Sequence, residues 1–301
     1  MKEVKTTFVD DVSNIFSKPD DASVNGTPSR RGWQSILLSP LWLCLLLALI
    51  VRIWLVIHTH GFLDGDENLV GIQAQHILRG ERPIYYYGQP YMGNLEAYLI
   101  ALIFAIAGSS VWTLRAEPTL LSLVLVCLAW QLAGALADGA GLSAYARRWF
   151  MTVAGLFAAL PPLYDMIMEL RTWGGHIEIY ILMLWLLLSV VRLTQRWAAG
   201  AGWREIALRW AVIGFIVGLG MWVYPLIICA ILAATIWIVG YFVLAISKAR
   251  RSLYAAPKEP HIPASIHIKN ILLVIAALPT CLIGFAPGIY WGAQNHWTNV
   301  L

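Results

Sequence analysis

The sequence is poor in charge, and it has no basic stripe of the kind that binds nucleic acid. Only 13% of its 301 residues are charged, whereas about 25% are charged in a typical soluble domain. Together with 59% hydrophobic residues and a mean hydropathy of +0.68, this shortage predicts a polytopic membrane protein. The net charge of +4 is small and the basic residues flank apolar segments, so we expect no nucleic-acid partner.

Cysteine is also scarce, and its positions exclude two further classes of protein. All four cysteines lie inside apolar runs, without the short spacings of a metal site: Cys44, Cys127, Cys229 and Cys281. A disulfide framework or a zinc site is therefore not expected, and these residues are predicted to pack in apolar surroundings.

Long apolar runs, in contrast, are abundant. A helix needs about 20 apolar residues to cross a hydrocarbon core of about 30 Å. By this criterion the sequence predicts an all-α protein with about seven transmembrane helices, at 36–58, 113–136, 148–164, 177–195, 206–223, 225–246 and 270–290. No small-residue cleavage site follows the first run, so we interpret it as an anchor and not as a signal peptide. The polar tail 1–35 has the composition of a disordered segment.

The distribution of Lys and Arg predicts the orientation in the membrane. If the amino terminus is cytoplasmic, 16 of the 21 basic residues fall on the cytoplasmic side, four fall outside, and Arg52 lies within the first span. This bias is typical of cytoplasmic loops. We therefore expect an integral membrane protein with a cytoplasmic amino terminus, in the plasma membrane of a bacterium.

The first outer loop, 59–112, is predicted to contain two helices that lie in the membrane interface. The first covers 67–79, with Asp66 as its N-cap and Gly80 as its stop signal. The second covers 95–107, which is apolar but too short to span. If 95–107 crossed the membrane, every later loop would change sides and the charge bias would be lost.

Carboxylates gather in the two outer loops. The first loop opens with three of them in four residues, Asp64-Gly65-Asp66-Glu67, and the second loop, around 164–177, brings Asp165, Glu169 and the neighbouring Glu178. Carboxylates at a membrane surface without as many basic partners favour a metal site, a proton-transfer task or a cationic ligand.

A resemblance to a known family follows from the arrangement of these motifs. The chain resembles the GT-C glycosyltransferases, of the protein O-mannosyltransferase and lipid A aminoarabinose transferase type, over about residues 36–290. The matching features are a tail, one span, an outer loop that opens with Asp-Glu, two surface helices and consecutive spans. The residues that carry the match are Asp66-Glu67, Gly80, Pro83-Ile84-Tyr85, Gly93 and Leu114-Arg115.

The resemblance implies a function. It implies an inverting transfer of a sugar from a polyprenyl-phosphate donor to a glycan, lipid or protein acceptor on the outer face. Asp66 would be the catalytic base, with Glu67 as its neighbour, because an acceptor hydroxyl must lose its proton as it attacks. Arg171 or Arg115 would stabilise the phosphate leaving group.

Further site residues are candidates on chemical grounds. A divalent ion, Mg²⁺ or Mn²⁺, could stabilise the phosphate in place of the arginines, held by Asp66, Glu169 or Glu178. His176 and Tyr85 are further candidates for substrate binding. Since family members continue beyond this region, 291–301 is interpreted as the start of another outer loop, and the chain as the amino-terminal module of a longer enzyme.

Several alternatives remain open. Asp66 could serve only as a helix cap, Glu67 could act on the helix dipole, and Arg171 could be a salt-bridge partner of the carboxylates. At the level of function, the alternatives are a membrane transporter or proton-coupled permease, and an inactive fragment or assembly subunit of a longer enzyme. The Gly214-xxx-Gly218 face is predicted to serve helix packing only.

Overall fold

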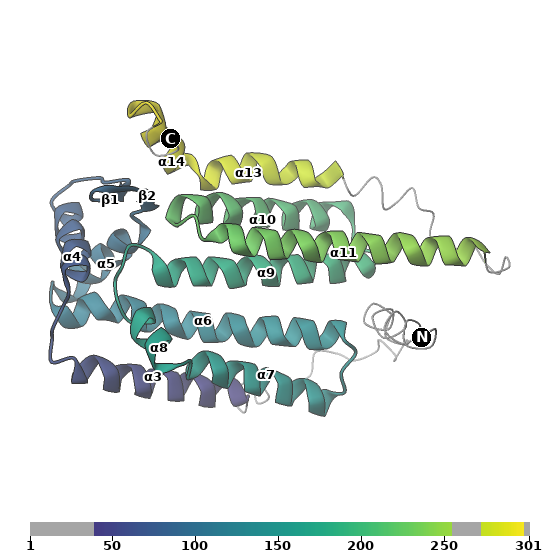
Figure 1. Cartoon of the computed structure of the whole chain (residues 1–301), viewed down its shortest axis with the longest axis horizontal. Coiled ribbons are helices and arrows are strands. Elements are labelled where there is room, and N and C mark those ends of the chain that lie inside the picture. The colour runs from purple at the N-terminus through teal and green to yellow at the C-terminus, as the bar shows by residue number, and fades with distance from the viewer. Residues whose placement is uncertain (1–38, 255–271, 298–301) are drawn as a thin grey trace, which may run out of the picture.

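The computed structural model describes residues 39–254 and 272–297 (Figure 1). The predicted tail 1–35, the segment 255–271 and residues 298–301 lie outside the described residues. Within these ranges the elements follow one another as α3 (Pro40–His58), α4 (Gly65–Leu78), β1 (Tyr85–Tyr86), β2 (Gln89–Gly93), α5 (Leu95–Ala107), α6 (Val111–Gly139), α7 (Ala144–Ala159), α8 (Leu163–Glu169), α9 (His176–Ala198), α10 (Trp203–Val223), α11 (Ile227–Tyr254), a 3₁₀ turn (Leu272–Ala276), α13 (Ala277–Gly284) and α14 (Ala286–Gln294).

Five of these helices are long and apolar enough to cross a membrane, and up to seven spans exist if two bent pairs each count as one. The protein is therefore a mostly helical, integral membrane protein. The first bent pair joins α7 to α8 at an angle of 71°, and the second joins α13 to α14 at 55°. Pro161 and Pro162 lie at the first break, where their rings and missing N–H groups oppose a continuous helix. The predicted span 148–164 is thus broken near its carboxyl-terminal end.

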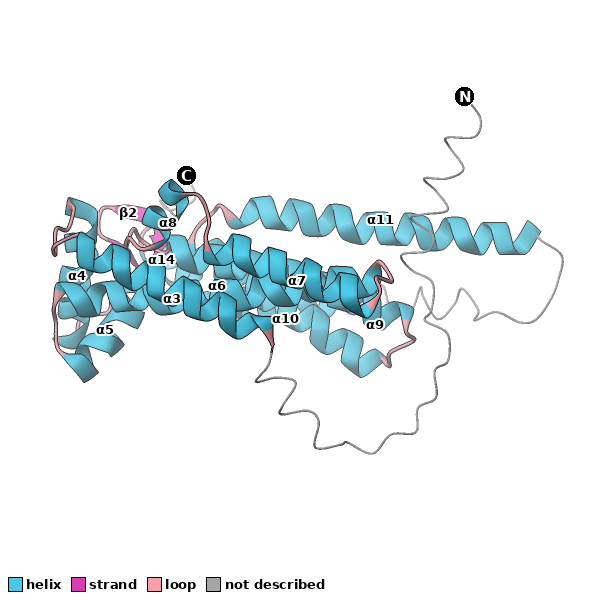
Figure 2. Cartoon of the chain, turned by 90° about the horizontal axis from the view of Figure 1, so that it is seen from below, coloured by secondary structure: helices cyan, strands magenta, loops and turns pink. Residues whose placement is uncertain are grey.

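The long helices run side by side in one bundle, with α4 and α5 standing at one end (Figures 1 and 2). One apolar cluster joins α3, α6 and α7, and a larger one joins α9, α10 and α11. Helix α13 packs so closely on α10 that a Cβ at Gly214 or Gly218 would overlap the backbone carbonyl of Ala277 or Cys281. This close approach confirms the helix-packing prediction for the Gly-xxx-Gly face.

The first outer loop contains one element that the all-α prediction lacks. Tyr85–Tyr86 and Gln89–Gly93 form a two-stranded antiparallel hairpin between α4 and α5. Its aromatic residues favour extended backbone, and Gly88 occupies the turn with a φ of 79°. The prediction was wrong for this segment because the run is short and lies between helical patterns. Gly93 allows the hairpin to touch the end of α10, since a Cβ there would lie 2.5 Å from the carbonyl oxygen of Trp222.

The predicted N-cap of the surface helix was wrong by two residues. Helix α4 begins at Gly65, and its cap is Asp64, whose carboxylate accepts a hydrogen bond from the Glu67 amide at 2.9 Å. The Glu67 carboxylate in turn accepts from the Asp64 amide at 3.2 Å, which completes a capping box. The helix ends before Gly80, which has a φ of 101°, as its sequence indicated. Asp66 is therefore not needed as a cap.

Candidate functional site

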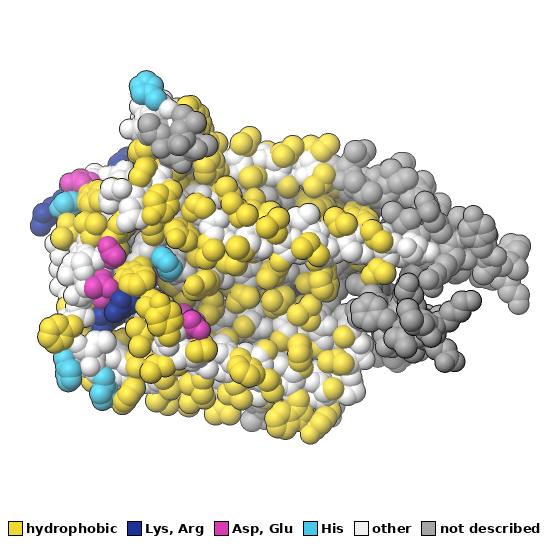
Figure 3. All heavy atoms as spheres, in the orientation of Figure 1, with side chains coloured by type: hydrophobic (Ala, Val, Ile, Leu, Met, Phe, Trp, Pro, Cys, Tyr) yellow, Lys and Arg dark blue, Asp and Glu magenta, His cyan; other side chains and the backbone are white. Residues whose placement is uncertain are grey.

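The two outer loops meet at the end of the bundle that carries α4 and α5. Asp64 from the first loop contacts Arg171 and Trp173 from the second, and Glu96 of α5 accepts a hydrogen bond from the Gly175 amide at 2.8 Å. In the space-filling view, charged and histidine side chains gather at this end, while the sides of the bundle are mainly hydrophobic (Figure 3). Residues more than 100 positions apart are thereby brought into one polar surface.

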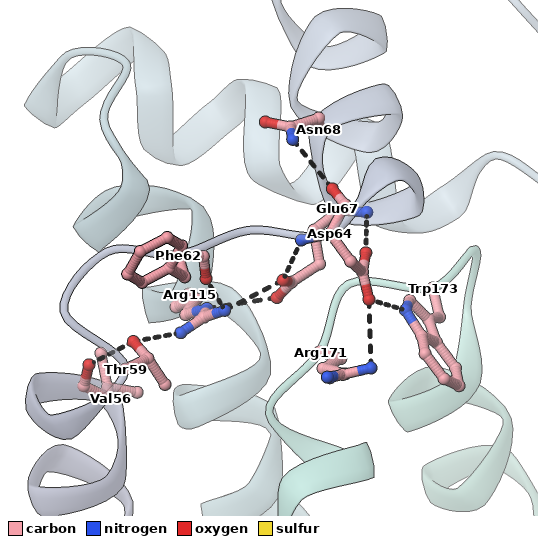
Figure 4. A network of polar contacts seen from close by, with 9 residues as sticks. All are labelled: Val56, Thr59, Phe62, Asp64, Glu67, Asn68, Arg115, Arg171 and Trp173. Carbon is pink, nitrogen blue, oxygen red and sulfur yellow. Dashed lines mark hydrogen bonds and ion pairs between the residues drawn. The ribbon is translucent and has the colours of Figure 1, made fainter.

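Glu67 is held in a buried ion pair with Arg115 (Figure 4). The guanidinium contacts both carboxylate oxygens, with Nε–Oε1 at 3.1 Å and Nη2–Oε2 at 2.9 Å. It also donates to the Thr59 hydroxyl and to the Phe62 carbonyl oxygen, so it ties the end of α3 to α4 and α6. The side chains of Glu67 and Arg115 are only 1% and 6% exposed. A two-point contact of this kind fixes the positions of both side chains, and it leaves neither the Glu67 carboxylate nor the Arg115 guanidinium free for another partner.

Asp64 is also fully engaged (Figure 4). One carboxylate oxygen, Oδ1, caps α4, and the other accepts from Arg171 Nη1 and from Trp173 Nε1, each at 3.1 Å. Arg171 also lies over the Trp173 ring, 5.1 Å from its centroid. Asp64 therefore clamps the second loop to the first turn of α4.

Asp66 is the exposed member of the three carboxylates. It lies in the first turn of α4, and none of the ion pairs among the described residues includes it. Tyr86 lies beside it: the Tyr86 hydroxyl donates to the Asp66 carbonyl oxygen at 3.3 Å and is also within hydrogen-bond reach of the Asp66 carboxylate. Burial, and next the negative charge of Asp66, raise the pKa of Tyr86. The first turn of α4 thus presents an available carboxylate next to a phenol that stays protonated.

A series of aromatic rings extends from Asp64 along this surface. Ring centroids lie 5.8 Å apart for Trp173 and His176, 5.2 Å apart for His176 and Tyr224, and 6.5 Å apart for Tyr224 and Tyr91. His176 is fixed within the series, because its Nδ1 lies 2.8 Å from the Trp173 carbonyl oxygen. We call Tyr91, Trp173, His176 and Tyr224 the aromatic wall.

Two cavities lie at the same end of the bundle. One of about 440 Å³ is bordered by the carboxyl-terminal end of α3 and by Arg115, Arg171 and Asp64. The other, of about 870 Å³, lies between the hairpin region and α14, with Arg82, Tyr98 and Tyr290 in its lining. Tyr85, predicted to bind substrate, is instead 7% exposed and packs its ring against Trp291 at 5.2 Å.

The two predicted metal ligands in and beside the second loop lie in different environments. Glu169 is paired with the buried Arg52, with Oε2 and Nη2 2.6 Å apart. Glu178 lies with Glu96 and Glu117, and ligand oxygens of these three carboxylates are all within 4.8 Å of one another. Among the described residues this is the one group of acidic, histidine or cysteine side chains that is spaced to hold a metal ion.

Sequence reasoning missed Glu96 and Glu117 as members of this group. Both are buried, and Glu117 lies within the long apolar helix α6. An ionisable residue inside a spanning segment is itself a signal of function, and this signal would have identified Glu117. The contact of Glu96 with the second loop could not have been found, because it depends on how α5 is placed against α9.

Comparison of the chain with protein-family models, with curated proteins and with solved structures gives no match.

Proposed function

We propose that this chain is a GT-C-type glycosyltransferase module. It would transfer a sugar from a polyprenyl-phosphate donor to a glycan, lipid or protein acceptor at the end of the bundle that carries α4 and α5. Asp66 is the proposed catalytic base, and the membrane supplies the lipid donor. The proposal combines the resemblance of the first outer loop with the geometry of its carboxylates.

One observation carries the assignment of the base. Of the three neighbouring carboxylates, Asp64 uses its oxygens to cap α4 and to bind the second loop, and Glu67 uses both of its oxygens on Arg115. Asp66 is exposed, none of the described ion pairs includes it, and the Tyr86 hydroxyl beside it leaves the rest of its carboxylate open. A base must be able to approach the hydroxyl that it deprotonates, and Asp66 meets this requirement best.

The proposed reaction needs one base and one displacement. The acceptor oxygen attacks the anomeric carbon and forms the new C–O bond, while its proton passes to the Asp66 carboxylate. The bond from the anomeric carbon to the phosphate oxygen breaks, and the electron pair leaves with polyprenyl phosphate. Attack opposite the leaving group inverts the anomeric centre. This outcome distinguishes the reaction from a double displacement, which would retain the configuration.

The surroundings supply groups that such a substrate requires. The aromatic wall offers ring faces for the apolar side of a sugar, next to the clamp of Asp64 and Arg171. Arg171 is 34% exposed at the 440 Å³ cavity, so it can face a phosphate as well as Asp64. Arg115 is less available for that role because Glu67 occupies its fork.

A transporter or proton-coupled permease is the second candidate, and the buried carboxylates in spanning helices favour it. A pathway would need polar groups through the depth of the bundle. Along α6, however, no Asp, Glu, His, Lys or Arg follows Glu117 until Asp138, and along α9 none follows Glu178 until Arg192. The buried charge is confined to one end, which fits a surface reaction better.

The test is a turnover assay with the purified protein in lipid nanodiscs. The donors would be radiolabelled polyprenyl-phosphate sugars, and the acceptors a membrane extract. We expect acceptor-dependent release of polyprenyl phosphate, and its loss in Asp66→Asn. Glu81→Gln, which changes another exposed carboxylate at the same end, is the matched control and should turn over normally. If the wild-type protein consumes no donor, the proposal is wrong, and the assembly-subunit interpretation replaces it.

A further inference from the structure

Three carboxylates from three helices meet in the interior of the bundle. Glu96 comes from the first turn of α5, Glu117 from the outer part of α6, and Glu178 from the first turn of α9. They are 1%, 2% and 4% exposed, and their ligand oxygens all lie within 4.8 Å of one another. Neither the base assignment nor the capping network of α4 uses these residues.

Most of these oxygens have no hydrogen-bond donor. Both oxygens of Glu117, both of Glu178 and Oε1 of Glu96 are buried without a partner among the described residues. None of the described ion pairs includes any of the three. Arg115, only two positions before Glu117, is occupied by Glu67 on the other side of α6. The unpartnered oxygens therefore need another positive partner.

Glu96 is oriented by the backbone of the second loop. Its Oε2 accepts from the Gly175 amide at 2.8 Å, at the amino terminus of the 23-residue helix α9. This amide and the helix dipole favour a charged carboxylate. Gly174 and Gly175, with φ values of 72° and 92°, allow the loop to make this contact. Because Oε2 is held by this hydrogen bond, the unpartnered Oε1 is the Glu96 oxygen that remains available to a cation shared with the two other carboxylates.

Burial of three like charges is too costly without compensation. Two kinds of positive partner can compensate them: shared protons or a metal cation. Glu117 and Glu178 are close enough for a proton to bridge them. A proton between these two would still leave Glu96 Oε1 without a partner, whereas one cation at the centre contacts all three carboxylates.

We propose that Glu96, Glu117 and Glu178 bind one hard divalent cation of the Mg²⁺, Mn²⁺ and Ca²⁺ class. The donor set consists only of carboxylate oxygens, which these ions prefer over softer metals. Metal–oxygen distances of about 2.0 to 2.6 Å place two ligands of one ion at most about 5 Å apart. The observed spacing of 4.8 Å or less fits this limit.

The cation would act as a structural tie in the outer end of the bundle. It would hold α5, an element of the first outer loop, against α6 and α9, and so would fix the junction between the two loops. This inference does not depend on the proposed transferase function, because a structural cation is equally compatible with the alternatives. Its test accordingly measures binding and stability, not turnover.

The experiment uses the full chain in detergent after treatment with a chelator. Mn²⁺ is titrated, and the free ion is followed by electron paramagnetic resonance, with Mg²⁺ and Ca²⁺ as competitors. We expect one Mn²⁺ per chain, and a rise of the unfolding temperature when it binds. Glu117→Gln should weaken binding at least tenfold and remove the thermal response. Glu81→Gln, an exposed carboxylate outside the group, should leave both unchanged.

Two results would overturn the proposal. One is a wild-type protein that binds no more Mn²⁺ than Glu117→Gln does. This result would mean that protons alone compensate the three carboxylates. The other is an unfolding temperature of the wild type that neither chelator nor Mn²⁺ changes. If Glu117→Gln does not fold, Glu96→Gln and Glu178→Gln provide the same comparison, since each removes one charge and keeps the size of the side chain.

Discussion

Among the described residues, buried ion pairs occur only at the end of the bundle that carries α4 and α5, whereas more exposed pairs occur at both ends. At the end away from α4 and α5, Arg147 pairs with Asp138 between side chains that are 40% and 54% exposed. At the opposite end, the pairs Arg115–Glu67 and Arg52–Glu169 have side chains no more than 8% exposed. The first kind of pair is open to its surroundings, whereas the second is enclosed by protein.

This difference separates charged residues that only interact with the surroundings from those that hold parts of the structure together. An exposed ion pair contributes about 0–1 kcal/mol and is readily lost. A buried pair has a large desolvation cost, and removal of one partner leaves a charge that the interior tolerates poorly. The end that carries α4 and α5 therefore contains buried ion pairs with a high desolvation cost, at positions where apolar side chains would have none. We interpret this as the requirement of a site that must hold two loops together and leave Asp66 exposed.

The largest predicted effect on stability is at Arg115. Arg115→Ala leaves Glu67 buried without its partner, and we expect the free energy of unfolding to fall by about 3–5 kcal/mol. Arg147→Ala at the other end should change it by at most about 1 kcal/mol. Both can be measured by denaturant unfolding of the solubilised protein, followed by tryptophan fluorescence. Equal losses for the two variants would remove the distinction between the ends.

A smaller effect is expected at Gly93, where the hairpin touches α10. A methyl group there would lie 2.5 Å from the Trp222 carbonyl oxygen and 2.9 Å from its indole ring. Gly93→Ala should therefore lower the unfolding free energy by about 1–3 kcal/mol. Gly202→Ser is the control at the other end, since a Cβ at Gly202 would meet nothing within 4 Å. If Gly93→Ala is as stable as the control, the hairpin does not pack as described.

The smallest effect concerns Tyr87, whose hydroxyl donates to Glu81 at 2.7 Å. Partial burial, and next the hydrogen bond to Glu81, raise the pKa of Tyr87 from 10 to about 12. Because the unfolded chain loses this proton first, the contribution of Tyr87 to stability is complete below about pH 10 and is lost as the pH rises to about 12. Tyr87→Phe should lose about 0.5–1.5 kcal/mol at neutral pH.

The pH dependence of the stability of Tyr87→Phe tests the role of the hydroxyl directly. The difference in unfolding free energy between wild type and Tyr87→Phe should shrink between about pH 10 and about pH 12. Absorbance titration of the tyrosines should show one fewer late-titrating group in the variant. A difference that stays constant across this range would contradict the role of the Glu81 contact.

Much of the fold could be predicted from the sequence, because spans follow from apolar length alone. The helices α3, α6, α9, α10 and α11 lie close to their predicted ranges. The hairpin at 85–93 could not be predicted in this way, since a short aromatic run has no period long enough to separate strand from loop. The breaks in α7–α8 and α13–α14 were missed because hydropathy does not register a bend.

The candidate site was less predictable, for a physical reason. The sequence placed Asp64, Asp66 and Glu67 together, but it could not show which of them would be engaged. That depends on Arg115 and Arg171, which lie 48 and 107 positions away from their partners. The same holds for Glu96 and Glu117, whose meeting with Glu178 depends on packing between three helices.

The most direct test of the account measures stability and turnover together in three variants, Asp64→Asn, Asp66→Asn and Glu67→Gln. We predict that Asp66→Asn keeps the unfolding free energy of the wild type and loses donor turnover. Asp64→Asn and Glu67→Gln should lose stability, and their folded fraction should keep measurable turnover. If Asp66→Asn turns over as the wild type does, or if Asp64→Asn is fully stable but inactive, the division of roles among the three carboxylates is contradicted.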